Sequence, residues 1–437
     1  MVVGAGVGGL CVVRALSESF THVTLVERDT VTTNGTPRRG VPQGAHVHSL
    51  TSRGATVLEE FFPGFIDELS AEGATVAEAL GELDIVFFGS RLRRVPLDRV
   101  VQVSRPFLED RLRDKVRALP NITFRHGMEA VGPVAGDGTR VTGVRLSRPG
   151  VPESGEVLDA DLVVDAMGRA GRGATWLKSL GYQKPSETRL GVDVGYASRR
   201  FRVAADAVRT DKGVLIGATP ARPRGLVLTR QENDLWVLSQ YGFGRRNHPP
   251  ATHEEFLPYA QELLPVGAWE TLQDAEPVTE VTAFTYPASV RRDFHRLREL
   301  PDGLLSTGDA LCSLNPIYGA GMTVAALEAV ALRACLADGT RDLPRRFYKA
   351  AARASYLPWL FSTMADRALP FVPGTRPVVA RTLAASFRAT MRAASADAHV
   401  AAAVWNAVSL TGSPSALARP RVLASVLREW SPRTGSR

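Results

Sequence analysis

The sequence predicts an α/β protein in three parts: a parallel-sheet domain, an inserted and mostly antiparallel β-sheet domain, and a helical C-terminal region. Three observations carry this prediction. Residues 1–27 have the pattern of strand, glycine-rich turn, helix and strand; residues 190–290 hold short alternating β-rich segments; and the chain after residue 345 is Ala- and Arg-rich and helical in character. A strand–helix–strand unit pairs its strands in parallel, whereas closely spaced alternating segments favour antiparallel pairing.

Composition and charge narrow the class of protein. Of the 437 residues 44% are hydrophobic and 22% are charged, which is the balance of an ordinary globular chain. The net charge of +8 arises from 53 basic residues, mostly Arg, and it is uneven, because residues 341–437 carry a net +11 and residues 1–340 a net −3. This uneven distribution argues against a uniformly basic nucleic-acid binder, and we expect no nucleic-acid partner.

The cysteines and the lack of long apolar runs bear on the compartment. Cys11, Cys312 and Cys335 are an odd number and form no C-x-x-C pair, so we expect neither disulfides nor a zinc site. A membrane-spanning helix needs about 18 or more consecutive apolar residues, and the chain contains no such run. We therefore predict a cytoplasmic protein with no transmembrane segment and no bound metal.

The chain opens on a nucleotide-binding pattern. Gly4, Gly6 and Gly9 have the G-x-G-x-x-G spacing between a strand that ends at Val3 and a helix over 10–19, and a second strand follows at 23–27. The first glycine permits a tight turn, the second lets a diphosphate approach the backbone, and the third lets helix and strand pack closely. Glu27 ends the second strand, where a carboxylate accepts hydrogen bonds from a ribose. The pattern predicts a Rossmann-like dinucleotide site that also includes the adjacent Arg28.

The later elements follow in chain order after an irregular loop over 31–50. The pattern predicts helices at 51–72, 104–118 and 321–336, and strands near 84–88, 161–165, 192–196, 225–228, 235–238 and 304–307. The predicted Rossmann-like domain takes residues 1–75, 100–180 and 295–340, the inserted sheet domain 76–99 and 181–294, and the helical region 341–437. Candidates to line a substrate pocket on the inserted sheet are Tyr196, Trp236, Tyr241 and Phe284.

A second motif indicates that the cofactor is a flavin and not a nicotinamide. Gly308-Asp309-Ala310 follows a strand, and the run Leu314 to Thr323 opens a helix. This arrangement resembles the G-D motif and the flavin-adjacent loop of flavoprotein monooxygenases. The resemblance implies that Asp309 binds the ribityl chain of FAD and that Gly321 and Met322 lie beside the isoalloxazine. It identifies no acid or base, so the catalytic candidates are confined to the loop residues Pro316, Gly319, Gly321 and Met322.

A longer resemblance concerns the loop from Arg38 to Leu50, with the sequence RRGVPQGAHVHSL. It is similar to a loop of bacterial flavoprotein epoxidases that act on polyether precursors, a group related to squalene epoxidase and to aromatic hydroxylases. The segments SRPFLE at 104–109 and VDAMGR at 164–169 support it. The resemblance implies that Arg105 contacts FAD and that Arg39 lies along the adenosine or diphosphate. We interpret His46 and His48 as loop-packing residues, because their i, i+2 spacing does not suit a helical metal pair.

The resemblance implies a cytoplasmic FAD-dependent monooxygenase of secondary metabolism that epoxidises or hydroxylates a lipophilic, polyketide-like intermediate with O₂, through a flavin C4a-hydroperoxide. One G-x-G-x-x-G pattern occurs, so NAD(P)H would dock transiently or a separate flavin reductase would supply electrons. A flavin halogenase is not expected, since no W-x-W is present. The alternative is a Diels-Alderase-like cyclase in which FAD is purely structural. The basic C-terminal helices could cap the pocket, meet an anionic carrier protein, touch a membrane surface or be merely solvated.

Overall fold

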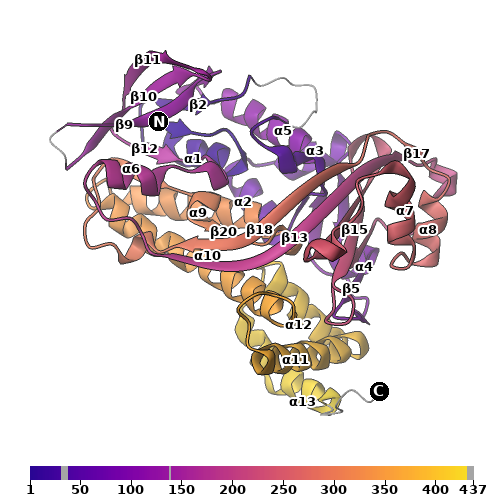
Figure 1. Ribbon diagram of the computed structural model, residues 1–437. Helices are drawn as coiled ribbons and strands as arrows, with labels where there is room; N and C mark the ends of the chain where they lie inside the picture. Colours follow the sequence, from indigo (N-terminus) through magenta and orange to yellow (C-terminus); the bar gives the residue numbers. More distant parts are fainter. Residues whose placement is uncertain (31–37, 137–138, 431–437) are drawn as a thin grey trace.

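The computed structural model describes residues 1–30, 38–136 and 139–430, and its first layer is a parallel sheet (Figure 1). Its strand order is β19-β12-β1-β2-β8, and every neighbouring pair is parallel. The bounds are β1 (Val2–Val3), β2 (Val23–Glu27), β8 (Ile122–His126), β12 (Val163–Asp165) and β19 (Leu304–Ser306). Strands far apart in the sequence thus meet around β1, which places the glycine turn at the centre of the carboxyl edge.

The largest sheet is long and mostly antiparallel, with the order β20-β18-β13-β16-β15-β14-β5-β6 and β17 (Glu276–Pro277) paired with β13. Its strands are β5 (Leu83–Phe87), β6 (Ser90–Arg91), β13 (Glu187–Arg202), β14 (Gly213–Ile216), β15 (Arg224–Arg230), β16 (Leu235–Phe243), β18 (Thr282–Arg292) and β20 (Cys312–Ser313). β14 and β5 pair in parallel. Figure 1 shows that β13 and β18 run from the α6 end to the α7 end.

Two smaller antiparallel sheets complete the strands. One has the order β11-β10-β9, with β9 (Glu129–Ala135), β10 (Val141–Arg148) and β11 (Val151–Asp159). The other has the order β3-β7-β4, with β3 (Ser49–Leu50), β4 (Thr75–Glu78) and β7 (Arg99–Gln102). This second sheet ties the loop that follows residue 38 to the segment just before the helix at Arg105.

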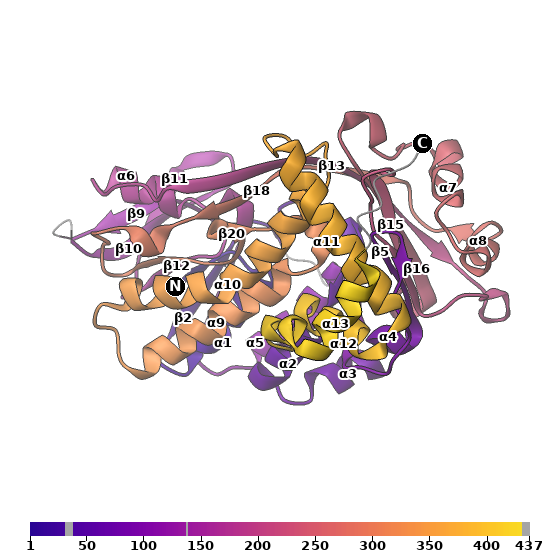
Figure 2. The same cartoon turned by 90° about the horizontal axis from the view of Figure 1, so that it is seen from below.

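The helices divide into those that cover the sheets and those at the C-terminal end. The first group is α1 (Val7–Ser17), α2 (Ser52–Phe61), α3 (Phe65–Ala71), α4 (Ala79–Glu82), α5 (Arg105–Arg117), α6 (Gly173–Ser179), α7 (His253–Gln261), α8 (Val266–Leu272), α9 (Gly321–Ala337) and α10 (Leu343–Arg367). The second is α11 (Pro377–Ala396), α12 (Ala398–Val408) and α13 (Pro420–Glu429). Figure 2 shows α9 and α10 side by side, with α11–α13 gathered beyond them near α4 and β5.

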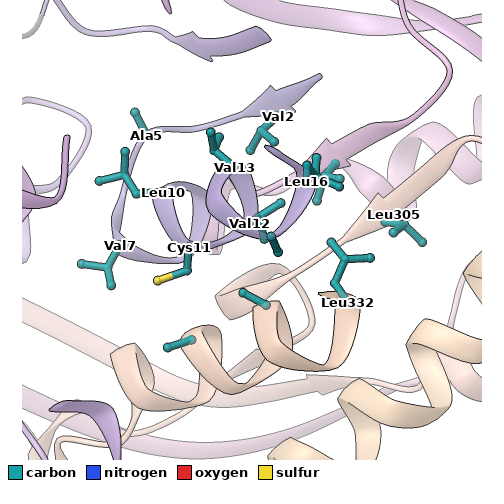
Figure 3. Packing of buried hydrophobic residues seen from close by; sticks show 14 of the residues in the cluster. Val2, Ala5, Val7, Leu10, Cys11, Val12, Val13, Leu16, Leu305 and Leu332 are labelled. Atoms are coloured by element: carbon teal, nitrogen blue, oxygen red, sulfur yellow. The ribbon is translucent and has the colours of Figure 1, made fainter. Parts of the chain in front are cut away.

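The core of the parallel-sheet layer is built around α1, whose residues are mostly apolar and buried. Leu10, Cys11, Val12 and Val13 are each fully buried, because α1 lies between the sheet and α9. Figure 3 shows Cys11 and Val12 on the side of α1 that faces Leu332 of α9, and Leu10 and Val13 on the side of the strand that carries Val2. Among the described residues, no helix has both the length and the apolar character needed to cross a bilayer.

The predicted fold class is confirmed, and the differences lie at element boundaries. The helix predicted over 51–72 is two helices, α2 and α3, because Gly64 adopts a left-handed conformation (φ +81°) after Pro63. The strand predicted at 192–196 is the middle of the sixteen-residue β13. α5 begins where a Ser side chain caps it: the Phe107 amide donates to Ser104 Oγ at 3.3 Å.

Candidate functional site

A cavity of about 1150 Å³ lies where the glycine turn, the loop after residue 38, the large sheet and the C-terminal helices meet. Small-molecule sites usually occupy about 300–1,000 Å³, so this cavity has room for a large ligand or for two ligands side by side. It has a polar end at the glycine turn and an apolar end between the large sheet and helices α11 and α12.

At the polar end the three glycines have separate structural roles. Gly4 has φ +105°, and a Cβ there would lie 2.5 Å from the Ala166 carbonyl oxygen. A Cβ on Gly9 would lie 1.9 Å from the Gly4 carbonyl oxygen, so Gly9 permits the close packing of α1 on the turn. Gly6 lines the cavity and precedes the first residue of α1. The unpaired amides of this helix terminus favour an anion in front of Gly6.

A chain of alternating charges lies beside the turn. Arg38 Nη1 is 2.8 Å from Glu27 Oε2, and Arg38 Nη2 is 2.5 Å from Glu109 Oε2. Arg105 Nε donates to the other oxygen of Glu109 at 2.6 Å. Burial alone would raise the pKa of Glu109, but Arg105 and Arg38 outweigh burial and hold that pKa below its usual range. Glu27 also accepts a hydrogen bond from the Ala5 amide at 2.8 Å, so the network is anchored to the glycine turn.

The structure places some, but not all, of the arginines expected from the sequence at the cavity. Arg28 and Arg105 line the cavity, whereas Arg39 is exposed and its neighbour Arg38 takes the place at the cavity wall. Sequence reasoning did not nominate Arg38 or Glu109, although both stand inside the motif segments used for the resemblance. The motif segments therefore point to this region of the chain. Which of the two adjacent arginines reaches the cavity depends on the path of the loop.

Asp309 faces the cavity from the turn after β19. Among the residues that the structure describes, its carboxylate has no hydrogen-bond partner, although it lines the cavity together with Arg105 and Arg169. Burial raises the pKa of Asp309, and the positive charges of Arg105 and Arg169 act against that rise. An acceptor held in this way is suited to a ligand that carries hydroxyl groups.

The predicted flavin-adjacent loop also lies on the cavity wall. Pro316, Gly319, Gly321 and Met322 all line it, and Gly319 has a left-handed conformation (φ +65°). The seventeen-residue helix α9 begins at Gly321 with no side-chain cap at its N-terminus. Its N-terminal dipole therefore presents a partial positive charge to the cavity.

The histidines of the loop pack as expected. His46 Nδ1 is 2.7 Å from Ser198 Oγ, and His48 Nδ1 is 3.0 Å from the His46 carbonyl oxygen. Burial lowers the pKa of His46 to about 4, and burial together with Arg105 lowers that of His48 to about 3, so both are neutral at neutral pH. In the described part of the chain no three or more His, Cys, Asp or Glu side chains are grouped to hold a metal.

The apolar end of the cavity is built from the sheet and the C-terminal helices. Tyr196, Tyr241 and Phe284 line it, whereas Trp236 does not and instead packs in the separate core of Phe201, Leu238 and Phe256. Wall residues of α11 and α12 that the sequence did not indicate are Leu383, Phe387, Met391, Val404 and Trp405, and Leu410 adds to the wall from the turn after α12. The Phe387 ring stacks on the Phe88 ring with centroids 4.9 Å apart, which joins α11 to the turn between β5 and β6.

A buried polar cluster adjoins the flavin-adjacent loop, and sequence reasoning did not find it. Asp366, at the end of α10, is fully buried, and its Oδ1 accepts hydrogen bonds from Tyr318 Oη (2.8 Å) and Asn315 Nδ2 (3.0 Å). Tyr196 donates to Asn315 Oδ1 at 3.3 Å. Tyr318 and Tyr196 line the cavity, so the cluster connects the cavity wall to a buried carboxyl group.

Comparison with known proteins agrees with this geometry. A family model described as an FAD-binding domain matches residues 1–343. Protein Rv3254 of Mycobacterium tuberculosis is 33% identical over 380 residues, which cover 84% of this chain and 79% of that protein.

Solved structures share the fold at lower identity. A flavoprotein/dehydrogenase from Cytophaga hutchinsonii has a TM-score of 0.68 at 15% identity, covering 97% of this chain and 95% of that one. The p-nitrophenol 4-monooxygenase from Pseudomonas putida has a TM-score of 0.64 at 16% identity, covering 94% and 97%. A Diels-Alderase of pyrroindomycin biosynthesis has a TM-score of 0.64 at 18% identity, covering 93% and 79%. The chain belongs to the FAD-binding domain family, whose model matches residues 1–343.

Proposed function

We propose that this protein uses FAD and O₂ to epoxidise or hydroxylate a lipophilic small molecule held at the apolar end of the cavity. The observation that carries the proposal is the continuity of that cavity from the glycine turn to the apolar wall of α11 and α12. A dinucleotide at the polar end and a lipophilic molecule at the other end would share one continuous cavity. A monooxygenase needs this proximity, because the activated oxygen must reach the substrate before water does.

The residues at the polar end fit FAD. Gly6 and the N-terminus of α1 would receive the diphosphate, because a glycine at this position lets a diphosphate approach the backbone closely. Glu27 would accept from the adenosine ribose, and Asp309 has the free acceptor that the ribityl hydroxyls require. Arg38 and Arg105 would lie along the diphosphate. FAD, when bound, supplies the redox and oxygen-activating chemistry, which no side chain of the protein can provide.

The protein's own contribution is positioning and the exclusion of water. The α9 N-terminus at Gly321 favours negative charge in the part of the cavity that it faces. Phe387, Met391 and Trp405 keep the other end apolar. Electrons would come from NAD(P)H that docks transiently or from a separate flavin reductase, because the sequence holds one dinucleotide pattern.

The test is turnover under isotopically labelled O₂ with a panel of lipophilic alkenes and phenols, repeated without O₂ and without reductant. The proposal predicts labelled oxygen in a product and loss of activity in both controls. Unlabelled product at an undiminished rate in both controls would instead establish a non-redox cyclase with structural FAD. The fold is compatible with either chemistry, so the isotope decides.

A further inference from the structure

The outer face of α13 is apolar, although the helix lies at the molecular surface. Leu423 and Leu427 are 45% and 68% exposed, and Trp430, which follows the last residue of the helix, is 42% exposed. Their spacing of four and three residues places all three on one face of the helix. These three residues are called the apolar stripe below. Figure 1 shows α13 at the outer end of the helical cluster, away from the parallel sheet.

The opposite face of α13 is fixed to the rest of the cluster. Val422 is buried among apolar side chains of α11 and α12. Ser425 Oγ donates to Asp397 Oδ2 at 3.1 Å, and Glu429 Oε2 lies 3.6 Å from Arg392 Nε. Contacts on the inner face of the helix therefore hold the apolar stripe outward.

Positive charge lies beside the apolar stripe. Arg421 and Arg428 are exposed on α13, and Glu429 is the one acidic residue of the helix. Because Glu429 already pairs with Arg392, it does not neutralise the two exposed arginines. Residues 377–437 contain eight Arg and no Lys against one Asp and one Glu, a net charge of +6. Exposed Leu and Trp side chains beside basic residues are typical of helices that lie in a membrane interface.

We propose that the outer face of α13 docks this protein onto a lipid bilayer that carries anionic headgroups. Leu423 and Leu427 enter the boundary between headgroups and acyl chains, and Trp430 lies at the level of the headgroups. Arg421 and Arg428 pair with lipid phosphates. The helix lies on the bilayer in this arrangement and does not cross it.

The chemistry of the surface favours this occupant over two others. The last seven residues of the chain, SPRTGSR, hold two further Arg and no large apolar side chain, so they do not match the stripe. A second copy in a symmetric contact would bring the same positive charge to the same surface. An anionic bilayer supplies both an apolar interior and negative charge.

The docking surface adjoins the helices that hold the apolar end of the cavity. Leu417, in the short helix η9 (Pro414–Ala418), lines the cavity and packs against the cluster of apolar side chains that includes Val422 of α13. A lipophilic substrate dissolved in the bilayer would therefore meet the protein near that end of the cavity. This link to the substrate rests on the proposed function, whereas the docking itself does not.

The experiment is co-sedimentation of the FAD-loaded protein with vesicles of phosphatidylcholine alone or of phosphatidylcholine mixed with phosphatidylglycerol. Wild type should bind the mixed vesicles, more weakly at high salt, because salt screens the charges. Leu423→Ser, Leu427→Ser and Trp430→Ser combined should abolish binding. Arg421→Gln with Arg428→Gln should weaken it by roughly tenfold to thirtyfold.

Two matched controls change equivalent exposed residues elsewhere. Val266→Ser on α8 replaces an apolar side chain that is 75% exposed, and Arg245→Gln with Arg246→Gln removes two exposed charges after β16. Both should keep wild-type binding. Urea unfolding of every variant should stay close to that of wild type, because each substituted side chain is exposed.

Four results would overturn the proposal. Wild type that does not bind the mixed vesicles would exclude the docking, and equal binding to phosphatidylcholine alone would exclude the role of charge. Binding that survives the loss of the apolar stripe would mean that charge alone acts, as it would on an acidic protein partner. A dimer in sedimentation velocity without vesicles, dissociated by the same three substitutions, would assign the stripe to a subunit interface. No measurement needs O₂, reductant or substrate, so this outcome is independent of the oxygen-label test.

Discussion

Asp309 and Glu27 are both carboxylates at the polar end of the cavity, yet their surroundings differ. Glu27 is already engaged by the Ala5 amide and by Arg38, so it contributes to the structure of the turn before any ligand binds. Asp309 faces the cavity and has no hydrogen-bond partner among the described residues, so its acceptor capacity is left for a ligand. The two residues should therefore respond differently to substitution.

The substitution Asp309→Ala should impair FAD retention. A carboxylate that accepts from ribityl hydroxyls makes charge-assisted bonds worth about 1.5–3 kcal/mol each, so loss of one should weaken FAD binding by roughly ten- to a hundredfold. The ratio of visible to ultraviolet absorbance after dialysis measures the occupancy. Asp302→Ala, at a nearby exposed position, is the control and should keep wild-type occupancy. Equal occupancy in the two variants would show that Asp309 does not bind the cofactor.

The buried carboxyl group of Glu328 should make the free energy of unfolding depend on pH. Its Oε2 accepts from Thr307 Oγ1 at 2.8 Å and from the Gly308 amide at 2.6 Å, and burial raises its pKa from 4.5 to about 8. The native state therefore holds the proton more tightly than the unfolded state. The contribution of Glu328 to the free energy of unfolding is therefore fully present below pH 4.5, and it is lost as the pH rises through about 8.

The measurement is the free energy of urea unfolding for wild type and Glu328→Gln across this pH range. The difference between the two proteins should change by an amount on the order of 4 kcal/mol, in the direction that disfavours wild type as the pH rises. A difference that stays constant with pH would mean that Glu328 titrates normally in the native protein.

At the scale of elements, two glycines at the start of α1 have different roles: Gly9 permits close packing, and Gly6 leaves room for a ligand. A methyl group on Gly9 would collide with the Gly4 carbonyl oxygen at 1.9 Å, whereas one on Gly6 would meet Arg105 Nη2 at an ordinary 3.4 Å. Gly9→Ala should therefore lower the free energy of unfolding of the apoprotein by about 1–3 kcal/mol. Gly6→Ala should fold with nearly wild-type stability and yet bind FAD at least about tenfold more weakly.

Urea unfolding of the apoproteins and FAD titration of both variants check this pair. The reverse pattern, an unstable Gly6→Ala and a stable Gly9→Ala, would contradict the assignment of roles to the two glycines. An unaltered FAD affinity in Gly6→Ala would mean that the diphosphate does not approach this residue.

The elements that the sequence predicted well are those whose signals are local. The strand at 23–27 and the helices near 104–118 and 321–336 have hydrophobic periodicity and boundary residues within a single segment, and the structure has them within a few residues. The prediction of one continuous helix over 51–72 was wrong. The apolar spacing is helical on both sides of Gly64, so the spacing does not reveal the left-handed residue that ends one helix and starts the next.

The candidate site was less predictable, because much of it depends on contacts between distant segments. Tyr318 and Asp366 are 48 residues apart and meet only where α10 packs against the loop after β20. Arg38 and Arg39 have the same chemistry, and the loop path alone decides which one reaches Glu109. Trp236 and Tyr241 are five residues apart on β16 and therefore point to opposite faces of the sheet, but what packs on each face decides which of them borders the cavity.

At the scale of the whole molecule, the cavity joins three distant parts of the chain. The parallel sheet supplies the polar end, the long antiparallel sheet supplies one wall, and α11 and α12 close the apolar end. Figures 1 and 2 show these helices as a separate cluster beyond α10, past the 1–343 region that the family model matches. The cavity wall is thus formed partly by residues that the family model matches and partly by helices outside it.

The most direct test of the account is the identity and stoichiometry of the flavin in the purified protein, since the proposed function depends on an FAD site at the glycine turn. Gly6, Glu27 and Asp309 line one cavity. The account predicts a yellow protein from which denaturation releases one free FAD per chain. A covalently held flavin, FMN in place of FAD, or a colourless protein that FAD cannot reconstitute would contradict it.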